Sequence, residues 1–354
     1  MICIEVLQKE QKKAPISFTK KVTVVQFILS ILVVYQHTQY SYSGITFGKI
    51  QQFLFYLIQA AVPMFFMISG YLFYRTFKPE NTKEKLLSRV RTLVIPYLVW
   101  NVIYTVFTVV LYKLNFIKNT YIEFNWKILV QTINSDFSPL WFLKYLIVFS
   151  LMAPAMYYLL KNKYIGGAVV ASTIALNVVL ITCGVIKAPL DVNSNSFAMF
   201  NYQYVYYVVG AYSALHLKNV IEQPHRNKTA IGICGVSVLC LLYWMPFFEN
   251  SVLIGHTFRL FFVVFLWFAF DLLRDIEIKP FLKTSFFIYC SHLMIVQCMQ
   301  GVIKTAFSRI FETGSIVYLL EWVFIPIVTV LIVLCGAQIL KKYTPVVWKI
   351  LTGR

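Results

Sequence analysis

Apolar segments, each long enough to cross a bilayer as a helix, recur along the whole of this sequence. A transmembrane helix needs about 20 consecutive, mostly apolar residues. Only 13% of the 354 residues are charged, against about 25% in an average soluble domain. The pattern predicts an all-α, polytopic membrane helix bundle with about ten transmembrane helices. We place these helices at residues 22–41, 52–74, 93–112, 140–160, 165–186, 200–217, 229–248, 253–272, 284–303 and 316–340.

Basic residues set the orientation of these helices. Most of the 32 Lys and Arg residues fall in every second connecting segment, and segments rich in Lys and Arg stay in the cytoplasm. We therefore expect both termini to be cytoplasmic, and we assign the net charge of +18 to the lipid bilayer rather than to nucleic acid. The predicted domains are a basic cytoplasmic segment at 1–21, a transmembrane domain at 22–340 and a short basic cytoplasmic tail at 341–354.

The start of the chain and its cysteines bear on signal-peptide processing and on disulfide or metal sites. The first apolar run has no small-residue cleavage site, so we expect it to remain as the first transmembrane helix rather than to be removed as a signal peptide. The seven cysteines include no CxxC pair and no cluster with His. We therefore predict neither a disulfide framework nor a zinc site, and no bound metal or cofactor.

The first apolar run carries an ionisable residue near its far end. As a helix, it places Gln26, Ser30 and His37 on one face. Such a polar stripe can simply pack against neighbouring helices. Because an ionisable group inside a bilayer is energetically unfavourable, His37 is also a candidate for a functional site.

Other ionisable residues are expected within the membrane, each in a different span. An unpaired charge at that depth is not tolerated, so residues from separate spans predict a shared polar cavity. A transporter or proton relay uses such a cavity, and so does an enzyme that passes a group between the two membrane faces. Structural pairing remains the alternative for each side chain. These residues are Lys144, Arg259, His292 and Glu321, and His256 lies three residues before Arg259 as its helical neighbour.

The most basic stretch lies between the second and third spans, where we expect a cytoplasmic loop. Six Lys and Arg residues occur in residues 75–91. They can contact anionic lipid headgroups. Arg89 and Arg91 can instead bind a phosphorylated donor, because a guanidinium group contacts phosphate through two N–H groups. The sequence leaves both interpretations open.

Several stretches together resemble the acyltransferase-3 family of integral membrane acyltransferases. The similar pieces follow in order over most of the chain, at residues 32–37, 62–72, 89–100, 139–143 and 287–292. The resemblance implies transfer of an acyl group, most often acetyl from acetyl-CoA, to a carbohydrate hydroxyl at the outer face. Similar members act on bacterial exopolysaccharide, capsule or cell-wall sugars and include O-succinyltransferases. This implies a bacterial plasma-membrane O-acetyltransferase or O-succinyltransferase, with acyl-CoA on the cytoplasmic side as donor substrate.

The resemblance also implies roles for individual residues. His37 matches the histidine that the family uses for transfer, while Arg89 and Arg91 match arginines assigned to acyl-CoA. Gln26 stands where many members have an arginine, so the chain keeps a hydrogen-bond donor there and loses the charge. The candidates for lining the cavity or stabilising the oxyanion are Gln26, Lys144, Arg259, His292 and Glu321.

Acyl transfer from a thioester to a hydroxyl needs a base for the hydroxyl proton and donors for the oxyanion. Histidine suits the base because its unperturbed pKa is about 6.5. We expect His37 to act either as that base or as a transient acyl carrier. The alternative function is a secondary transporter or flippase for a glycan or small polar solute. It would explain the buried charges, but it predicts inverted repeats that we do not find in the sequence.

Overall fold

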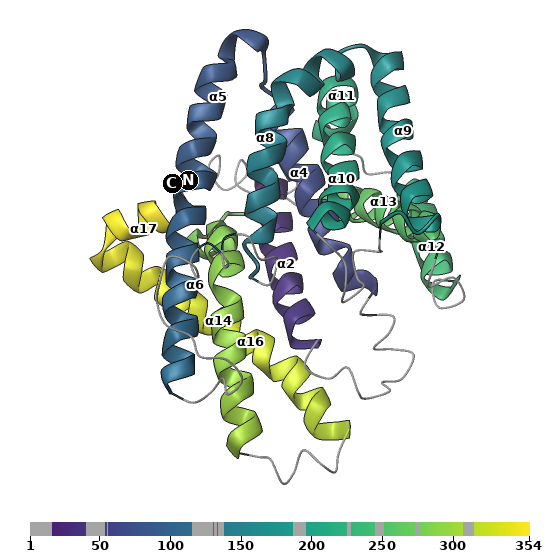
Figure 1. Ribbon diagram of the computed structural model, residues 1–354. Helices are drawn as coiled ribbons and strands as arrows, with labels where there is room; N and C mark the ends of the chain where they lie inside the picture. The colour runs from purple at the N-terminus through teal and green to yellow at the C-terminus, as the bar shows by residue number, and fades with distance from the viewer. Residues whose placement is uncertain are drawn as a thin grey trace, which may run out of the picture. The chain divides into compact units, whose positions relative to one another are not determined.

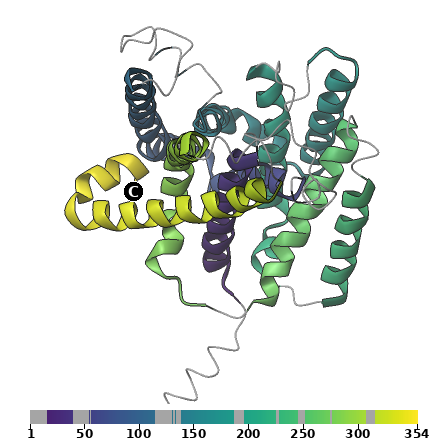
Figure 2. The ribbon, with the colours of Figure 1, turned by 90° about the horizontal axis from the view of Figure 1, so that it is seen from below.

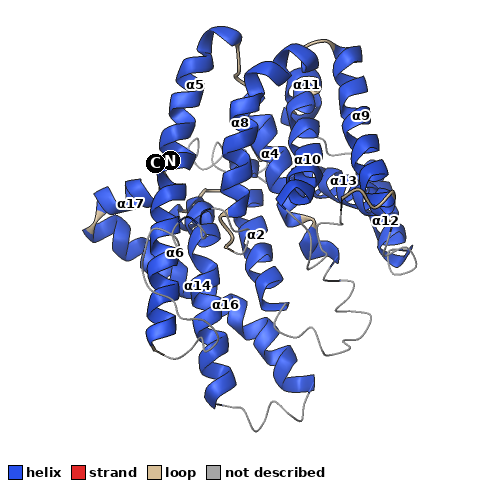
Figure 3. Ribbon diagram, in the orientation of Figure 1, coloured by secondary structure: helices blue, strands red, loops and turns tan. Residues whose placement is uncertain are grey.

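The structure is a computed structural model of the chain. It describes residues 16–39, 54, 56–114, 130, 133, 138–186, 196–224, 228–244, 251–273, 276–306 and 315–354. The side chains of residues 39, 196–199, 304–306 and 315–321 also lie outside the description. The regular structure of the described residues is helical and includes no strand (Figure 3).

Each of the ten predicted membrane segments contains a described helix (Figure 1). Eight stretches of the described chain are long and apolar enough to cross a membrane. The prediction of an all-α, polytopic membrane bundle is confirmed. The helices are α2 (Phe18–Gln39), α4 (Ala61–Tyr74), α6 (Ile95–Lys113), α8 (Trp141–Leu160), α9 (Lys163–Thr182), α10 (Ser196–His216), α12 (Lys228–Trp244), α13 (Val252–Ala269), α14 (Ser285–Ala306) and α16 (Ser315–Tyr343).

The basic stretch ahead of the third span is helical, and the prediction of a loop there was wrong. α5 (Thr82–Arg89) continues through the π-helix η3 (Val90–Val94) directly into α6. Pro96 has no N–H, and in a regular α-helix its ring would strike the Thr92 carbonyl. The wide π turn, closed by a bond from the Ile95 N–H to the Val90 carbonyl, accommodates this proline within a continuous helix.

The described helices group into two compact units. Unit 1 comprises residues 1–29, 47–79 and 152–283, and unit 2 comprises residues 30–46, 80–151 and 284–354. The divisions fall within α2 and α8, so these two helices contribute to both units.

Unit 1 contains a close crossing of α4 and α10. Gly70 of α4 lies against the Tyr207 carbonyl of α10, and Gly210 of α10 lies against the Met67 carbonyl of α4. A side chain at either glycine would occupy the space of that backbone. These two glycines therefore let the two helix backbones touch.

A buried ion pair joins α2 to the short helix η5 (Phe270–Leu272) in unit 1. The Lys21 ammonium lies 2.6 Å from Asp271 Oδ1 and 4.0 Å from the centroid of the Trp267 ring. Each side chain of the pair is only 2% exposed. Since α2 begins at Phe18, Lys21 is already within the helix and enters the core of the unit.

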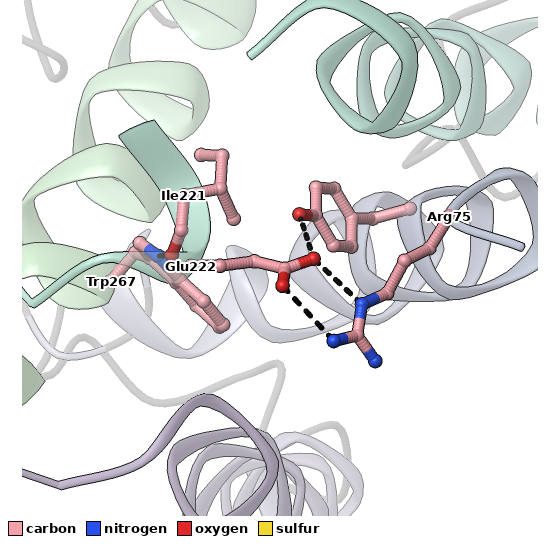
Figure 4. A network of polar contacts seen from close by, with 5 residues as sticks. Arg75, Ile221, Glu222 and Trp267 are labelled. Atoms are coloured by element: carbon pink, nitrogen blue, oxygen red, sulfur yellow. Dashed lines mark hydrogen bonds and ion pairs between the residues drawn. The ribbon is translucent and has the colours of Figure 1, made fainter. Parts of the chain in front are cut away.

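A second ion pair joins the end of α4 to α11 (Lys218–Glu222), as Figure 4 shows. Arg75 donates through Nε and Nη2 to the Glu222 carboxylate at 2.6 and 3.0 Å, and the Tyr71 hydroxyl donates to it at 2.9 Å. Beside this pair, the Trp267 indole N–H donates to the Ile221 carbonyl at 3.1 Å. The hydrogen bonds, above all those from Arg75, hold the pKa of Glu222 below its ordinary value.

In unit 2 the C-terminal helix packs back onto earlier helices. α17 (Pro345–Thr352) follows α16 and turns back beside it (Figure 2). The Trp100 indole N–H of α6 donates to the Leu351 carbonyl at 2.9 Å. The Trp348 ring of α17 packs on Phe287 of α14, with ring centroids 5.1 Å apart. The end of the chain is therefore anchored to α6, α14 and α16.

We predict that Lys21→Met destabilises the protein by about 3–5 kcal/mol, because it removes the cation that compensates the buried Asp271 carboxylate. Thermal unfolding of the purified protein in detergent measures this effect as a lower midpoint. The matched control is Lys228→Met, at an exposed lysine of the same unit. Equal, small effects of the two substitutions would contradict a role for the buried pair.

Candidate functional site

His37 and His292 lie against each other in unit 2. α2 carries His37 and α14 carries His292, and their ring centroids are 5.0 Å apart with the ring planes tilted by 47°. His292 is fully buried, whereas His37 is partly accessible. Two candidate residues that lie far apart in the sequence are thus brought into contact.

Backbone hydrogen bonds fix the position of the proton on His292. Its Nδ1 lies 2.7 Å from the Tyr289 carbonyl oxygen and 3.1 Å from the Ile288 carbonyl oxygen. A carbonyl only accepts hydrogen bonds, so Nδ1 carries the proton and the neutral ring has its lone pair at Nε2. This buried Nε2 has no hydrogen-bond partner in the described part of the chain. His292 therefore offers an unused acceptor beside His37.

Tyr289 brings a second unsatisfied group to the same part of α14. Its hydroxyl is buried and has no hydrogen-bond partner among the residues that the structure describes. Its ring centroid lies 6.2 Å from that of His292 and 5.3 Å from that of Phe142 in α8. The sequence places Tyr289 on the same helix face as His292, but a tyrosine in a membrane helix gives no signal that selects it.

Two further candidates belong to unit 2. Lys144 is half-buried in α8, with its ammonium 5.3 Å from the centroid of the Tyr145 ring. Glu321 belongs to α16, but its side chain lies outside the described residues. Neither observation assigns these two residues to the histidine pair.

Arg259 and Gln26 belong to unit 1. Arg259 of α13 is 7% exposed and donates through Nη2 to Gln59 Oε1 at 2.9 Å. Its guanidinium carbon lies 5.5 Å from the centroid of the Tyr202 ring in α10, and it also interacts with the Tyr206 hydroxyl. Gln26 is half-buried on α2. The predicted site residues are thus divided between the two units.

His256 links two further helices to α13. Its Nδ1 lies 2.7 Å from the Tyr206 hydroxyl of α10, and its Nε2 lies 2.6 Å from Asn177 Oδ1 of α9. Asn177 Oδ1 only accepts, so the proton is at Nε2 and Nδ1 accepts from the tyrosine. Sequence reasoning noted His256 as a helical neighbour of Arg259. It missed Asn177 and Gln59, because a single neutral amide in an apolar helix carries no pattern.

The arginines considered for a phosphorylated donor lie at the π turn of unit 2. Arg89 ends α5 and is partly buried, while Arg91 lies in η3 and is exposed. The end of the chain covers this turn. Gly353 adopts the left-handed conformation (φ +67°) and donates its N–H to the Lys349 carbonyl at 2.7 Å. A Cβ at Gly353 would lie 2.7 Å from the Arg91 carbonyl oxygen and 2.6 Å from Thr92 Cα.

A sequence model of the acyltransferase-3 family, described as an acyltransferase domain, matches residues 20–340. The chain belongs to the acyltransferase-3 family. With its apolar helices, this makes it a multi-pass membrane acyltransferase. Comparisons with curated proteins and with solved structures found no match. The matched range of this acyltransferase-3 chain includes the histidine pair, the π turn and the Arg259 network.

This acyltransferase-3 protein also has an apolar cavity of about 320 Å³ in unit 1. Side chains of α2, α4, α10, α11 and α13 line it, among them Met64 and Val263. The Ser213 hydroxyl in its wall already donates to the Val209 carbonyl at 2.8 Å. Because its lining residues include none of the candidates named above, we do not place acyl-transfer chemistry there.

We predict that Gly353→Ala loosens the contact between α17 and η3, because the added Cβ meets the η3 backbone and disfavours the left-handed conformation. Strain of 1–2 kcal/mol corresponds to roughly tenfold faster amide hydrogen exchange at residues 90–94 and 345–352. The control is Gly336→Ala in α16, where an added Cβ has no atom within 4 Å. Unchanged exchange in Gly353→Ala would contradict the described packing.

Proposed function

We propose that this protein is an O-acyltransferase of a bacterial cell membrane, which moves an acetyl group from acetyl-CoA to hydroxyls of a cell-surface or exported carbohydrate. The observation that carries the proposal is the contact between His37 and His292, in a chain of the acyltransferase-3 family. Burying an imidazole in a membrane helix is energetically unfavourable, so ionisable residues there usually have a function. Imidazole suits proton transfer because its pKa lies near neutral pH. Succinyl-CoA is the second donor considered, because the thioester chemistry is the same.

The proposed reaction transfers one acyl group and one proton. The acceptor hydroxyl oxygen forms a bond to the thioester carbonyl carbon, and the carbon–sulfur bond then breaks. His37 takes the hydroxyl proton and gives it to the departing sulfur, so that CoA leaves as the thiol. The products are the carbohydrate ester and free CoA.

His292 favours the role of His37 as a base over that of an acyl carrier. When an imidazole gains a proton, both ring nitrogens become donors and the second N–H needs an acceptor. We propose His292 Nε2 as this acceptor, because its Nδ1 is already bonded to backbone carbonyls and its ring lies against that of His37. We assign His292 as a positioning residue for His37. The Tyr289 hydroxyl is the proposed donor to the oxyanion.

Arg89 and Arg91 are proposed to hold the phosphates of acyl-CoA at the π turn. Charge-assisted bonds from guanidinium to phosphate contribute about 1.5–3 kcal/mol each. Arg89→Ala should therefore raise the KM for acetyl-CoA roughly tenfold or more and leave kcat close to its normal value. The matched control is Lys83→Ala, at an exposed lysine of α5. A fall in kcat with an unchanged KM would contradict this assignment.

The main test compares surface glycan, by mass, from cells that make the wild-type protein, His37→Ala or His216→Gln. We expect the acyl ester with the wild-type protein and with His216→Gln, which changes a histidine bonded to the Leu160 carbonyl. With His37→Ala, at an equal level of protein, we expect about 10²–10⁴-fold slower formation of the ester, because that is the usual contribution of a general base. In vesicles with labelled acetyl-CoA, Tyr289→Phe should lower kcat by about 10²–10³, because it removes the proposed donor to the oxyanion.

Two outcomes of this test would count against the proposal. Normal glycan acylation with His37→Ala would remove the histidine from the chemistry. Less glycan with its acylation intact in cells without the protein would favour the transporter or flippase, which the family match does not support.

A further inference from the structure

The buried network around Arg259 in unit 1 carries a positive charge that no carboxylate among the described residues compensates. A guanidinium group is always protonated in proteins. In the described part of the chain, Arg259 forms no ion pair, while the carboxylates of Asp271 and Glu222 pair with other cations. The partners of Arg259 are the neutral side chains of Gln59, Tyr202 and Tyr206. An uncompensated cation among membrane helices is typical of a binding site for an anion.

The same network has more hydrogen-bond donors than acceptors. Gln59 Oε1 and Asn177 Oδ1 are both occupied, by Arg259 and His256. Their amide nitrogens, Gln59 Nε2 and Asn177 Nδ2, are buried and have no partner among the described residues. Gln59 is 5% exposed and Asn177 is fully buried, so these donors are shielded from bulk solvent. A ligand that brings acceptor oxygens would satisfy them.

A glycine keeps one side of the guanidinium group clear. Gly255 precedes Arg259 by one helical turn in α13, and a Cβ there would lie only 2.8 Å from Arg259 Nη1. The absence of a side chain leaves that nitrogen accessible to a small group. Charge, spare donors and local space therefore point to the same kind of ligand.

We infer that the Arg259 network binds a carboxylate of the substrate. One carboxylate neutralises one guanidinium group, and its two oxygens match the paired N–H groups of arginine. A neutral sugar hydroxyl would leave the charge uncompensated, and a phosphate monoester would bring excess negative charge. The carboxylate belongs either to an acidic sugar of the acceptor or to the far end of a dicarboxylic acyl group such as succinyl. Only the naming of these two sources rests on the proposed function.

The test is ligand binding to the purified full-length protein, measured as a rise in Tm. The acceptor pair is an oligosaccharide of galacturonic acid and a neutral galactose oligosaccharide of the same length. The donor pair is succinyl-CoA and acetyl-CoA. We expect one acidic member to bind at least tenfold more tightly than its neutral counterpart, and the pair in which this happens identifies the source.

Arg259→Gln should abolish this preference for the acidic member. The matched control is Arg75→Gln, which removes a cation that Glu222 already compensates and should keep the preference even if Tm falls. If Arg259→Gln does not fold, Arg259→Lys keeps the charge and should weaken acidic binding several-fold, because the paired donors are lost. Binding of neutral members should stay unchanged in both Arg259 variants.

The inference is overturned if neither acidic probe binds more tightly than its neutral counterpart. It is also overturned if the preference survives in every Arg259 variant that folds. An equal rise in Tm with sodium chloride alone would show an adventitious ion only. Because the assay needs no acyl transfer, a protein that binds the acidic probe but transfers no acyl group would refute the proposed function and leave this inference intact.

Discussion

A bilayer offers no water to buried polar groups, so a polar side chain in a membrane helix needs a partner inside the protein or in a ligand. This chain satisfies many such groups internally. Lys21 pairs with Asp271, and the Tyr104 hydroxyl donates to the Cys290 carbonyl at 2.9 Å. Groups left without a described partner include His292 Nε2 in unit 2 and, in unit 1, the amides around Arg259. We place the proposed acyl transfer at the unpaired acceptor in unit 2. We place the proposed substrate carboxylate at the unpaired donors in unit 1.

Hydropathy predicted the membrane helices well, because the bilayer dictates both the length and the composition of a spanning helix. The basic stretch before the third span was predicted wrongly as a loop. The third span was predicted to begin at residue 93, yet the π turn at residues 90–94 joins it to α5 in one continuous helix. That turn is a feature of local backbone geometry, and Gly353 packs directly against it. Hydropathy reports neither.

The site residues were predicted as separate candidates rather than as assembled groups. His37 stood out because an ionisable group is rare in a membrane helix, but its contact with His292 joins segments far apart in the chain. Asn177 and Gln59 are neutral, so their importance shows only once Arg259 and His256 are placed beside them. The structure also assigns Arg259 to unit 1 and both His37 and His292 to unit 2, which a list of spans does not reveal.

We propose that His37 and His292 act as one unit in proton transfer. A double-mutant cycle on the rate of acyl transfer in vesicles tests it most directly, with His37→Ala, His292→Ala and the double variant compared at equal protein levels. If His292 works only through His37, the double variant is no slower than His37→Ala alone, and the coupling energy equals the whole effect of His292→Ala. If the two losses multiply instead, the residues act independently and the account is contradicted.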